Sequence, residues 1–109
     1  MTYQLILCTC PDEKFAEQIA QVLVEQRLAA CVNIIPQISS IYRWQDKVET
    51  AKEYLLIIKT KSECYAQLEQ CIKLQHPYAV PEIIGLDITQ GLPDYLKWID
   101  KSLDGLQNI

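Results

Sequence analysis

Thiols and one imidazole are the side chains of this chain that could bind a metal ion. The sequence contains five cysteines and one histidine, His76. Cys8 and Cys10 lie two residues apart in a predicted strand, so both side chains should point to the same face of the sheet. The predicted helix that begins just after Cys10 would favour their thiolate forms. A pair of thiolates suits soft ions, with Cu(I) preferred and Zn(II) the weaker alternative.

His76 could add an imidazole to this pair, and Cys71 precedes it by five residues near the end of a predicted helix. That separation exceeds one helical turn, so the two side chains converge only if the chain bends at Gln75. The predicted metal ligands are Cys8, Cys10, Cys71 and His76. Two simpler interpretations stay open. The cysteines could be small core residues, since cysteine is among the most buried residue types, and His76 could be a hydrogen-bonded connector at a tight turn.

The sequence lacks the motifs of catalytic sites. No nucleophile elbow, phosphate-binding glycine loop or histidine-rich metal motif is present, and the three glycines all lie late, at Gly85, Gly91 and Gly105. No C-x-x-C pair or zinc-finger spacing occurs among the cysteines, and Cys31 and Cys64 are predicted core residues. We therefore expect a protein that is not an enzyme and that requires no cofactor.

The composition is that of one globular domain over residues 1–109. The net charge is −4 and the lysines and arginines are scattered, which argues against nucleic acid and anionic membranes as partners. No apolar stretch is long enough to cross a membrane, and the N-terminus lacks the basic region that begins a signal peptide. An odd number of cysteines without a signal peptide indicates reduced thiols, so we expect a cytoplasmic location.

The hydrophobic patterns predict four strands and three helices. The predicted strands are Tyr3–Thr9, Ala30–Trp44 with Pro36 as a bulge or edge feature, a strand from Val48 onward whose strongest part is Tyr54–Ile58, and Ile83–Thr89. The predicted helices run from Pro11 at the first helical position to about Arg27, from an N-cap at Ser62 to a point before Pro77, and from Pro93 to about Leu103.

This order of elements predicts an α+β fold. It is the ferredoxin-like βαββαβ arrangement with an added C-terminal helix, and right-handed crossovers give an antiparallel sheet in the order 4-1-3-2. The strand directions place Cys8, Cys10, the N-terminus of the first helix, the tip of the hairpin and the His76–Tyr78 connection at one end of the sheet. That end is the expected position of a binding site.

The hairpin formed by the second and third strands is unusually long. Each of its strands could reach roughly 12 to 15 residues, or about 40 to 50 Å at ~3.3 Å per residue, whereas the other two strands have about seven. The excess length has no partner within one chain and carries Ile41, Tyr42 and Trp44. An isolated hairpin of this kind is marginal in water. We therefore expect an oligomer with Tyr42, Trp44 and Tyr78 at its interface.

Three separate motifs of the chain match one known family. They are Leu28–Pro36 (LAACVNIIP), Ser39–Glu49 (SSIYRWQDKVE) and His76–Ile84 (HPYAVPEII), in that order. They closely resemble motifs of the CutA family, small trimeric proteins linked to divalent-cation tolerance, and the resemblance extends from Cys8 to about Leu103. It implies a homotrimer that takes part in tolerance of divalent metal ions such as copper.

The chain departs from the family pattern at three positions. Ala79 replaces the usual glutamate of the His-Pro-Tyr segment, and Gln75 stands where some relatives have a second histidine. Asp46 replaces a glycine in the hairpin turn, where aspartate still tolerates a left-handed conformation. With the glutamate and the second histidine missing, any metal site should bind weakly or be built from cysteines alone.

Two other classes of function fit the same architecture. PII-like trimeric signalling modules share the ferredoxin-like fold, bind a small molecule between subunits and dock a protein partner. Against this interpretation, the hairpin has few basic residues that could hold phosphate, only Arg43 and Lys47. A third possibility is a stable scaffold without a ligand. Nucleotide binding would favour the signalling module, and thiol-dependent metal binding would favour the metal-tolerance protein.

Overall fold

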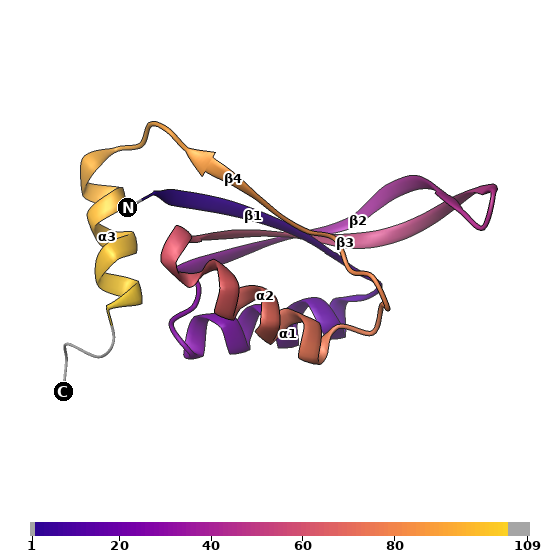
Figure 1. Ribbon diagram of the computed structural model, residues 1–109, viewed down its shortest axis with the longest axis horizontal. Helices are drawn as coiled ribbons and strands as arrows, with labels where there is room; N and C mark the ends of the chain where they lie inside the picture. The colour runs from indigo at the N-terminus through magenta and orange to yellow at the C-terminus, as the bar shows by residue number, and fades with distance from the viewer. Residues whose placement is uncertain (1, 105–109) are drawn as a thin grey trace.

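The computed structural model of the protein describes residues 2–104. Its strands are β1 (Tyr3–Cys10), β2 (Cys31–Trp44), β3 (Lys47–Lys61) and β4 (Ile83–Ile88), and its helices are α1 (Glu13–Glu25), α2 (Tyr65–Gln75) and α3 (Pro93–Leu103) (Figure 1). The predicted α+β class and the predicted sequence of elements are both observed. None of the helices in residues 2–104 combines the length and the apolar character needed to span a membrane.

The four strands form one antiparallel sheet in the order β2-β3-β1-β4, as predicted. β1 lies in the middle and pairs with β3 on one side and with β4 on the other. Helices α1 and α2 lie side by side across one face of this sheet, while α3 packs at the end where β1 begins (Figure 1). The end of β1 that carries the cysteines is therefore the opposite end of the sheet from α3.

The hydrophobic core lies between the sheet and the pair α1 and α2. Because side chains alternate along a strand, one face of β1 and β3 supplies the sheet side of this core. The fully buried residues are Ile6, Cys8, Cys10, Leu56 and Ile58 from the sheet and Ala16, Ile19, Leu23, Leu68 and Ile72 from the helices. Each large aliphatic side chain in this group contributes about 1.5–3 kcal/mol through its burial.

Two predicted helix starts are wrong in detail. Pro11 precedes α1, and Asp12 is the N-cap, because its Oδ1 accepts a hydrogen bond from the backbone N–H of Phe15 (2.9 Å). Ser62 does not cap α2. It begins a single 3-10 turn, and its backbone N–H donates instead to the carbonyl oxygen of Thr2 (2.8 Å), so the turn is tied to the start of β1.

The long hairpin is confirmed, with 14 residues in β2 and 15 in β3. Its register shifts between Ile35 and Ile38, where Pro36 and Gln37 of β2 oppose a single residue of β3. This is a β-bulge on an edge strand, one of the few places where a sheet tolerates proline. Gln45 and Asp46 both have positive φ, as the two central residues of a tight hairpin turn often do. In Figure 1 the hairpin projects well beyond the rest of the sheet.

Helix α3 is anchored by one carboxylate. Asp100 accepts hydrogen bonds from the Tyr3 hydroxyl (2.9 Å) and from Lys61 Nζ (3.1 Å). Burial disfavours the charged form of Asp100, but the hydrogen bonds from Lys61 and Tyr3 outweigh this effect and lower the pKa of the carboxyl group. The fully buried Ile99 supplies the apolar part of the same anchor.

Replacing Asp100 with asparagine should produce a small, pH-dependent loss of stability. Because the pKa of Asp100 is lowered by folding, its contribution is present above the unfolded-state pKa and is lost as the pH falls through the folded-state pKa. The difference in unfolding free energy between the parent and D100N should therefore shrink in acid. Urea unfolding across a pH series measures it, with D94N on the same helix as the control. A difference that does not change with pH would contradict a role for the ionised carboxylate.

Candidate metal centre

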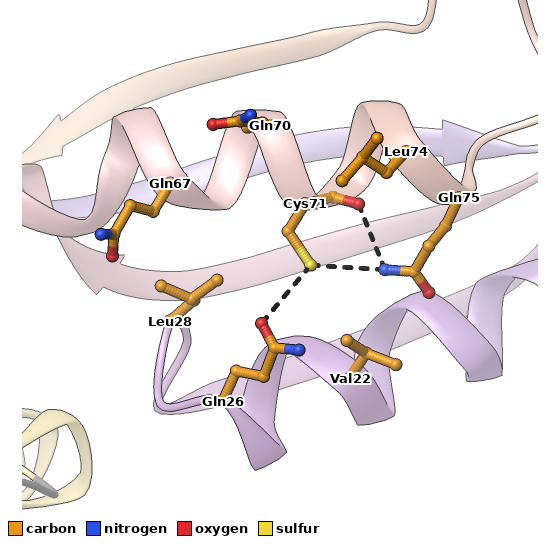
Figure 2. Close-up of a pocket in the computed structure, with 8 residues that line it drawn as sticks. All are labelled: Val22, Gln26, Leu28, Gln67, Gln70, Cys71, Leu74 and Gln75. Atoms are coloured by element: carbon orange, nitrogen blue, oxygen red, sulfur yellow. Dashed lines mark hydrogen bonds between the residues drawn. The ribbon is translucent and has the colours of Figure 1, made fainter.

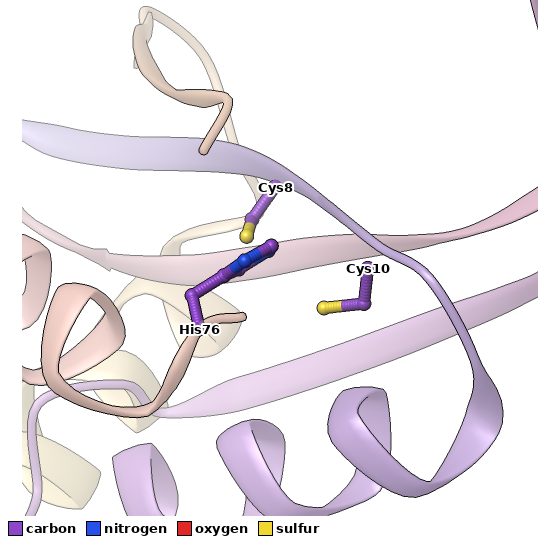
Figure 3. Close-up of side chains that lie close together, drawn as sticks. All are labelled: Cys8, Cys10 and His76. Atoms are coloured by element: carbon purple, nitrogen blue, oxygen red, sulfur yellow. The ribbon is translucent and has the colours of Figure 1, made fainter. Parts of the chain in front are cut away.

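Two thiols and the single imidazole lie together at the end of β1. The donor atoms of Cys8, Cys10 and His76 are all within 4.8 Å of one another (Figure 3). Cys8 and Cys10 are 0% exposed and His76 is 8% exposed. The sequence prediction that strand directions bring these residues to one end of the sheet agrees with this placement. Whether they bind a metal ion stays a prediction.

Local structure explains how each of these side chains reaches the cluster. Cys8 and Cys10 lie on the face of β1 that α1 and α2 cover, and their register partners in β3 are Leu56 and Tyr54. His76 directly follows α2, and its backbone N–H donates to the carbonyl oxygen of Ile72 (2.8 Å). The backbone of His76 is extended, as expected for a residue before a proline. The imidazole is therefore turned back toward the sheet where the helix stops.

Both ring nitrogens of His76 already have partners. Nδ1 accepts a hydrogen bond from the backbone N–H of Tyr78 (3.1 Å), and Nε2 lies 2.7 Å from the carbonyl oxygen of Thr9. An amide N–H can only donate and a carbonyl oxygen can only accept, so the proton must be on Nε2. The lone pair of Nδ1, which a metal ion would need, is held by the Tyr78 amide. The geometry therefore supports the connector interpretation of His76, and ligation would first require this bond to break.

The pKa values of the two neighbouring thiols are shifted in opposite directions. The interaction with the Cys10 thiol and the burial of the site raise the pKa of the Cys8 thiol. Nearby negative charge from Glu82 and Glu53 acts in the same direction. The interaction with Cys8 lowers the pKa of the Cys10 thiol, against the effect of burial. Cys10 is therefore the first of the pair to lose its proton, whereas Cys8 keeps its proton, and its Sγ donates to the carbonyl oxygen of Thr9 (3.9 Å).

Tyr78 and Glu53 form a second contact beside the cluster. The Tyr78 hydroxyl donates to Glu53 Oε2 (2.7 Å), and Glu53 is only 7% exposed. Burial and this hydrogen bond raise the pKa of Tyr78. Sequence reasoning gave Glu53 no role, although a glutamate placed directly before the apolar run Tyr54–Ile58 is a signal for a buried carboxylate that needs a partner.

The predicted convergence of Cys71 with His76 is not observed. Cys71 lies in a groove of about 570 Å³ between α1 and α2, and Figure 2 shows its thiol between the amide groups of Gln26 and Gln75. The sulfur accepts from Gln75 Nε2 (3.3 Å) and donates to Gln26 Oε1 (4.0 Å). Helix α2 continues without a bend to Gln75, so residues 71 and 76 do not meet.

The two cysteines that were predicted to be core residues are also placed differently. Cys31 and Cys64 are both partly exposed, so the prediction that they are core residues is wrong. Cys31 begins the edge strand β2, and Cys64 lies in the 3-10 turn before α2. All five thiols are free.

The predicted interface residues have exposed aromatic surface. Trp44 is 56% exposed, and Tyr42 and Tyr78 are also exposed. The Tyr78 hydroxyl, however, is already bound to Glu53 of its own chain. A contact of these three residues with another subunit stays a prediction.

Comparison with known proteins identifies close relatives. Residues 4–102 match the family model described as CutA1 divalent ion tolerance protein. The chain is 48% identical over 100 residues to "Protein CutA" of Mus musculus, covering 92% of this chain and 56% of that one. It is also 48% identical over 96 residues to the "Divalent-cation tolerance protein CutA" of Thermus thermophilus, covering 88% of this chain and 93% of the relative. The chain thus spans little more than half the length of the mouse protein.

Solved structures agree with the fold. A crystal structure of CutA from Xylella fastidiosa has a TM-score of 0.92 at 44% identity and covers 95% of this chain and 100% of that one. The periplasmic divalent cation tolerance protein CutA from Archaeoglobus fulgidus has a TM-score of 0.91 at 41% identity, covering 94% and 99%. The four-stranded antiparallel sheet with three helices therefore matches known CutA structures.

The tautomer of His76 can be tested directly, because it is the only histidine in the chain. The two hydrogen bonds of its ring predict a neutral imidazole with the proton on Nε2 and none on Nδ1. Proton–nitrogen correlation spectra of the imidazole near neutral pH distinguish the two tautomers. A proton on Nδ1, or rapid exchange between the two forms, would show that the Tyr78 amide does not hold this nitrogen.

Proposed function

This chain belongs to the CutA1 divalent ion tolerance family, and on that basis we propose that it is a homotrimer that contributes to metal tolerance by weakly binding a soft ion at the Cys8–Cys10 pair. The observation that carries this proposal is the pair of buried thiols with their sulfur atoms beside the imidazole. The free thiols support a reducing compartment, and we place the protein in the cytoplasm on that ground. Its relatives are named as tolerance proteins, and we assign it no catalytic role.

The chemistry of the donors favours Cu(I). Thiolates are soft ligands, which select Cu(I) and zinc over hard cations. Structural zinc sites are almost always four-coordinate, whereas this cluster offers three donors, one of which has its lone pair engaged. Cu(I), by contrast, can be bound by two thiolates alone. Weak binding is expected because both protons must leave and the pKa of Cys8 is raised by its surroundings.

The apolar surface of the chain supports assembly. Ile41 is 72% exposed, and Trp44 and Val48 beside it on the hairpin are also exposed. The sheet face opposite α1 and α2 adds Ile84 and Leu86, which are half-exposed on β4. Monomeric proteins rarely expose large apolar patches, so exposed apolar residues on both the hairpin and this sheet face favour assembly. We propose that this face and the hairpin, with Tyr42 and Trp44, pack against neighbouring subunits in a closed trimer, while the Tyr78 hydroxyl stays bound to Glu53 of its own chain.

Copper binding should depend on the two buried thiols. Reduced protein titrated with Cu(I) against a chromogenic chelator should bind copper, and replacing Cys8 and Cys10 with serine should remove most of it. H76A should reduce binding less, since its ring nitrogens are engaged. C64S, which changes a thiol outside the cluster, is the control. Zn(II) and ATP are titrated in parallel. Equal copper binding by the double serine variant would show that these cysteines are core residues, and tight ATP binding would favour a signalling module.

Light scattering should give a trimer of the 12.6 kDa chain at micromolar concentration. Truncation of a large aromatic residue in a packed site costs about 3–5 kcal/mol, so W44A should lower the stability of the assembly by that amount. W98A is a matched control, because Trp98 has similar exposure but lies on α3, away from the hairpin. A monomer in solution, or an unchanged melting temperature for W44A, would contradict the proposed interface.

A further inference from the structure

The buried thiols raise a problem of access. Cys8 and Cys10 have no exposed surface, and His76 packs against both (Figure 3). The residues that follow His76 are exposed, and Val80 is 83% exposed. His76 begins the connection His76–Pro81, which joins α2 to β4, so this connection forms one side of the thiol site. No ion or reagent can reach the sulfur atoms unless part of the structure around them opens.

The connection is held by a few side-chain contacts. Within residues 2–104, His76 ties it to the carbonyl oxygen of Thr9, and Tyr78 ties it to Glu53. The hydrogen bond between the Tyr78 amide and the His76 ring lies within the connection itself. Strands β1 and β3, by contrast, are paired along their whole shared length. A segment with few hydrogen bonds to its surroundings opens at lower free energy than a paired strand does.

Glu53 gives this segment a fixed attachment point. It lies on β3 opposite Ile38, at the bulge where the hairpin leaves the body of the sheet. A carboxylate that is 7% exposed needs a hydrogen-bond donor, and the Tyr78 hydroxyl supplies one at 2.7 Å. The bond joins the middle of the connection to β3, the strand that pairs with both β1 and β2.

We propose that the His76–Pro81 connection is a gate over the Cys8–Cys10 pair and that the hydrogen bond between Tyr78 and Glu53 is its latch. Pro77 and Pro81 restrict the backbone at both ends of the segment, so it opens as a stiff unit. Its use as a route for a metal ion rests on the proposed function. The gate itself is a property of the metal-free protein and is tested without any metal.

The test measures how fast the buried thiols react. Reduced, metal-free protein is treated with an alkylating maleimide, and labelling of the Cys8–Cys10 peptide is followed by mass spectrometry. Y78F should label roughly 10- to 100-fold faster than the parent, the factor expected for loss of a hydrogen bond to a carboxylate. Y3F is the matched control. It removes another tyrosine–carboxylate hydrogen bond, Tyr3 to Asp100 at 2.9 Å, at the opposite end of β1 from the thiols, and should leave the rate unchanged.

Urea separates the gate from global unfolding. Local opening exposes little surface, so labelling of the pair should change little at low urea concentrations, whereas labelling through global unfolding would rise steeply. E53A should speed labelling as much as Y78F, and the double variant should label no faster than the faster single variant. A parent-like rate for Y78F, multiplying effects in the double variant, or a steep urea dependence would each overturn the proposal. Because no copper is present, a failed copper titration would leave this result standing and would refute only the metal site.

Discussion

The arrangement around the thiols depends on one imidazole with two hydrogen bonds. The His76 ring joins the carbonyl oxygen of Thr9, at the end of β1, to the amide of Tyr78, in the connection that leads to β4. Buried backbone groups need partners, and these two groups find them in the same side chain. The ring thereby closes the site, directs Tyr78 toward Glu53 and sets the path of the chain from α2 to the far edge of the sheet.

The same two bonds limit the chemistry of the cluster. Of the three donors that come together, the imidazole is the only nitrogen donor. The lone pair on its Nδ1, however, already accepts a hydrogen bond from the backbone amide of Tyr78. The thiols are therefore left as the available ligands, and their soft character selects the kind of ion. The residue that organises the site is thus the one least able to bind an ion in it. A histidine close to two cysteines completes a three-ligand site only if one of its ring nitrogens is not already engaged in a hydrogen bond.

The alternation of side chains along the strands and the order of the elements made most of the fold predictable, together with the positions of the three clustered residues. They placed Cys8 and Cys10 on one face, brought His76 to the same end, and identified the long hairpin with its bulge at Pro36. Side-chain partners distant in the sequence were not predictable. Glu53 meets Tyr78 only in the folded chain, and the position of Cys71 depends on where α2 ends and which way it faces. Pro11 and Ser62 were misplaced because both residue types suit several positions near a helix start.

The bulge at Pro36 and Gln37 also affects whether other chains can add strands to the edge of this sheet at high protein concentration. Strand β2 is an edge of the sheet, and an edge with a continuous row of free amide and carbonyl groups would template endless strand addition. Pro36 has no N–H to offer, and the bulge twists the strand at the same point. A strand of another chain that paired with this edge could not continue its hydrogen bonds past Pro36 and Gln37. The irregularity in β2 therefore protects a chain rich in exposed apolar strand residues from growing into fibres.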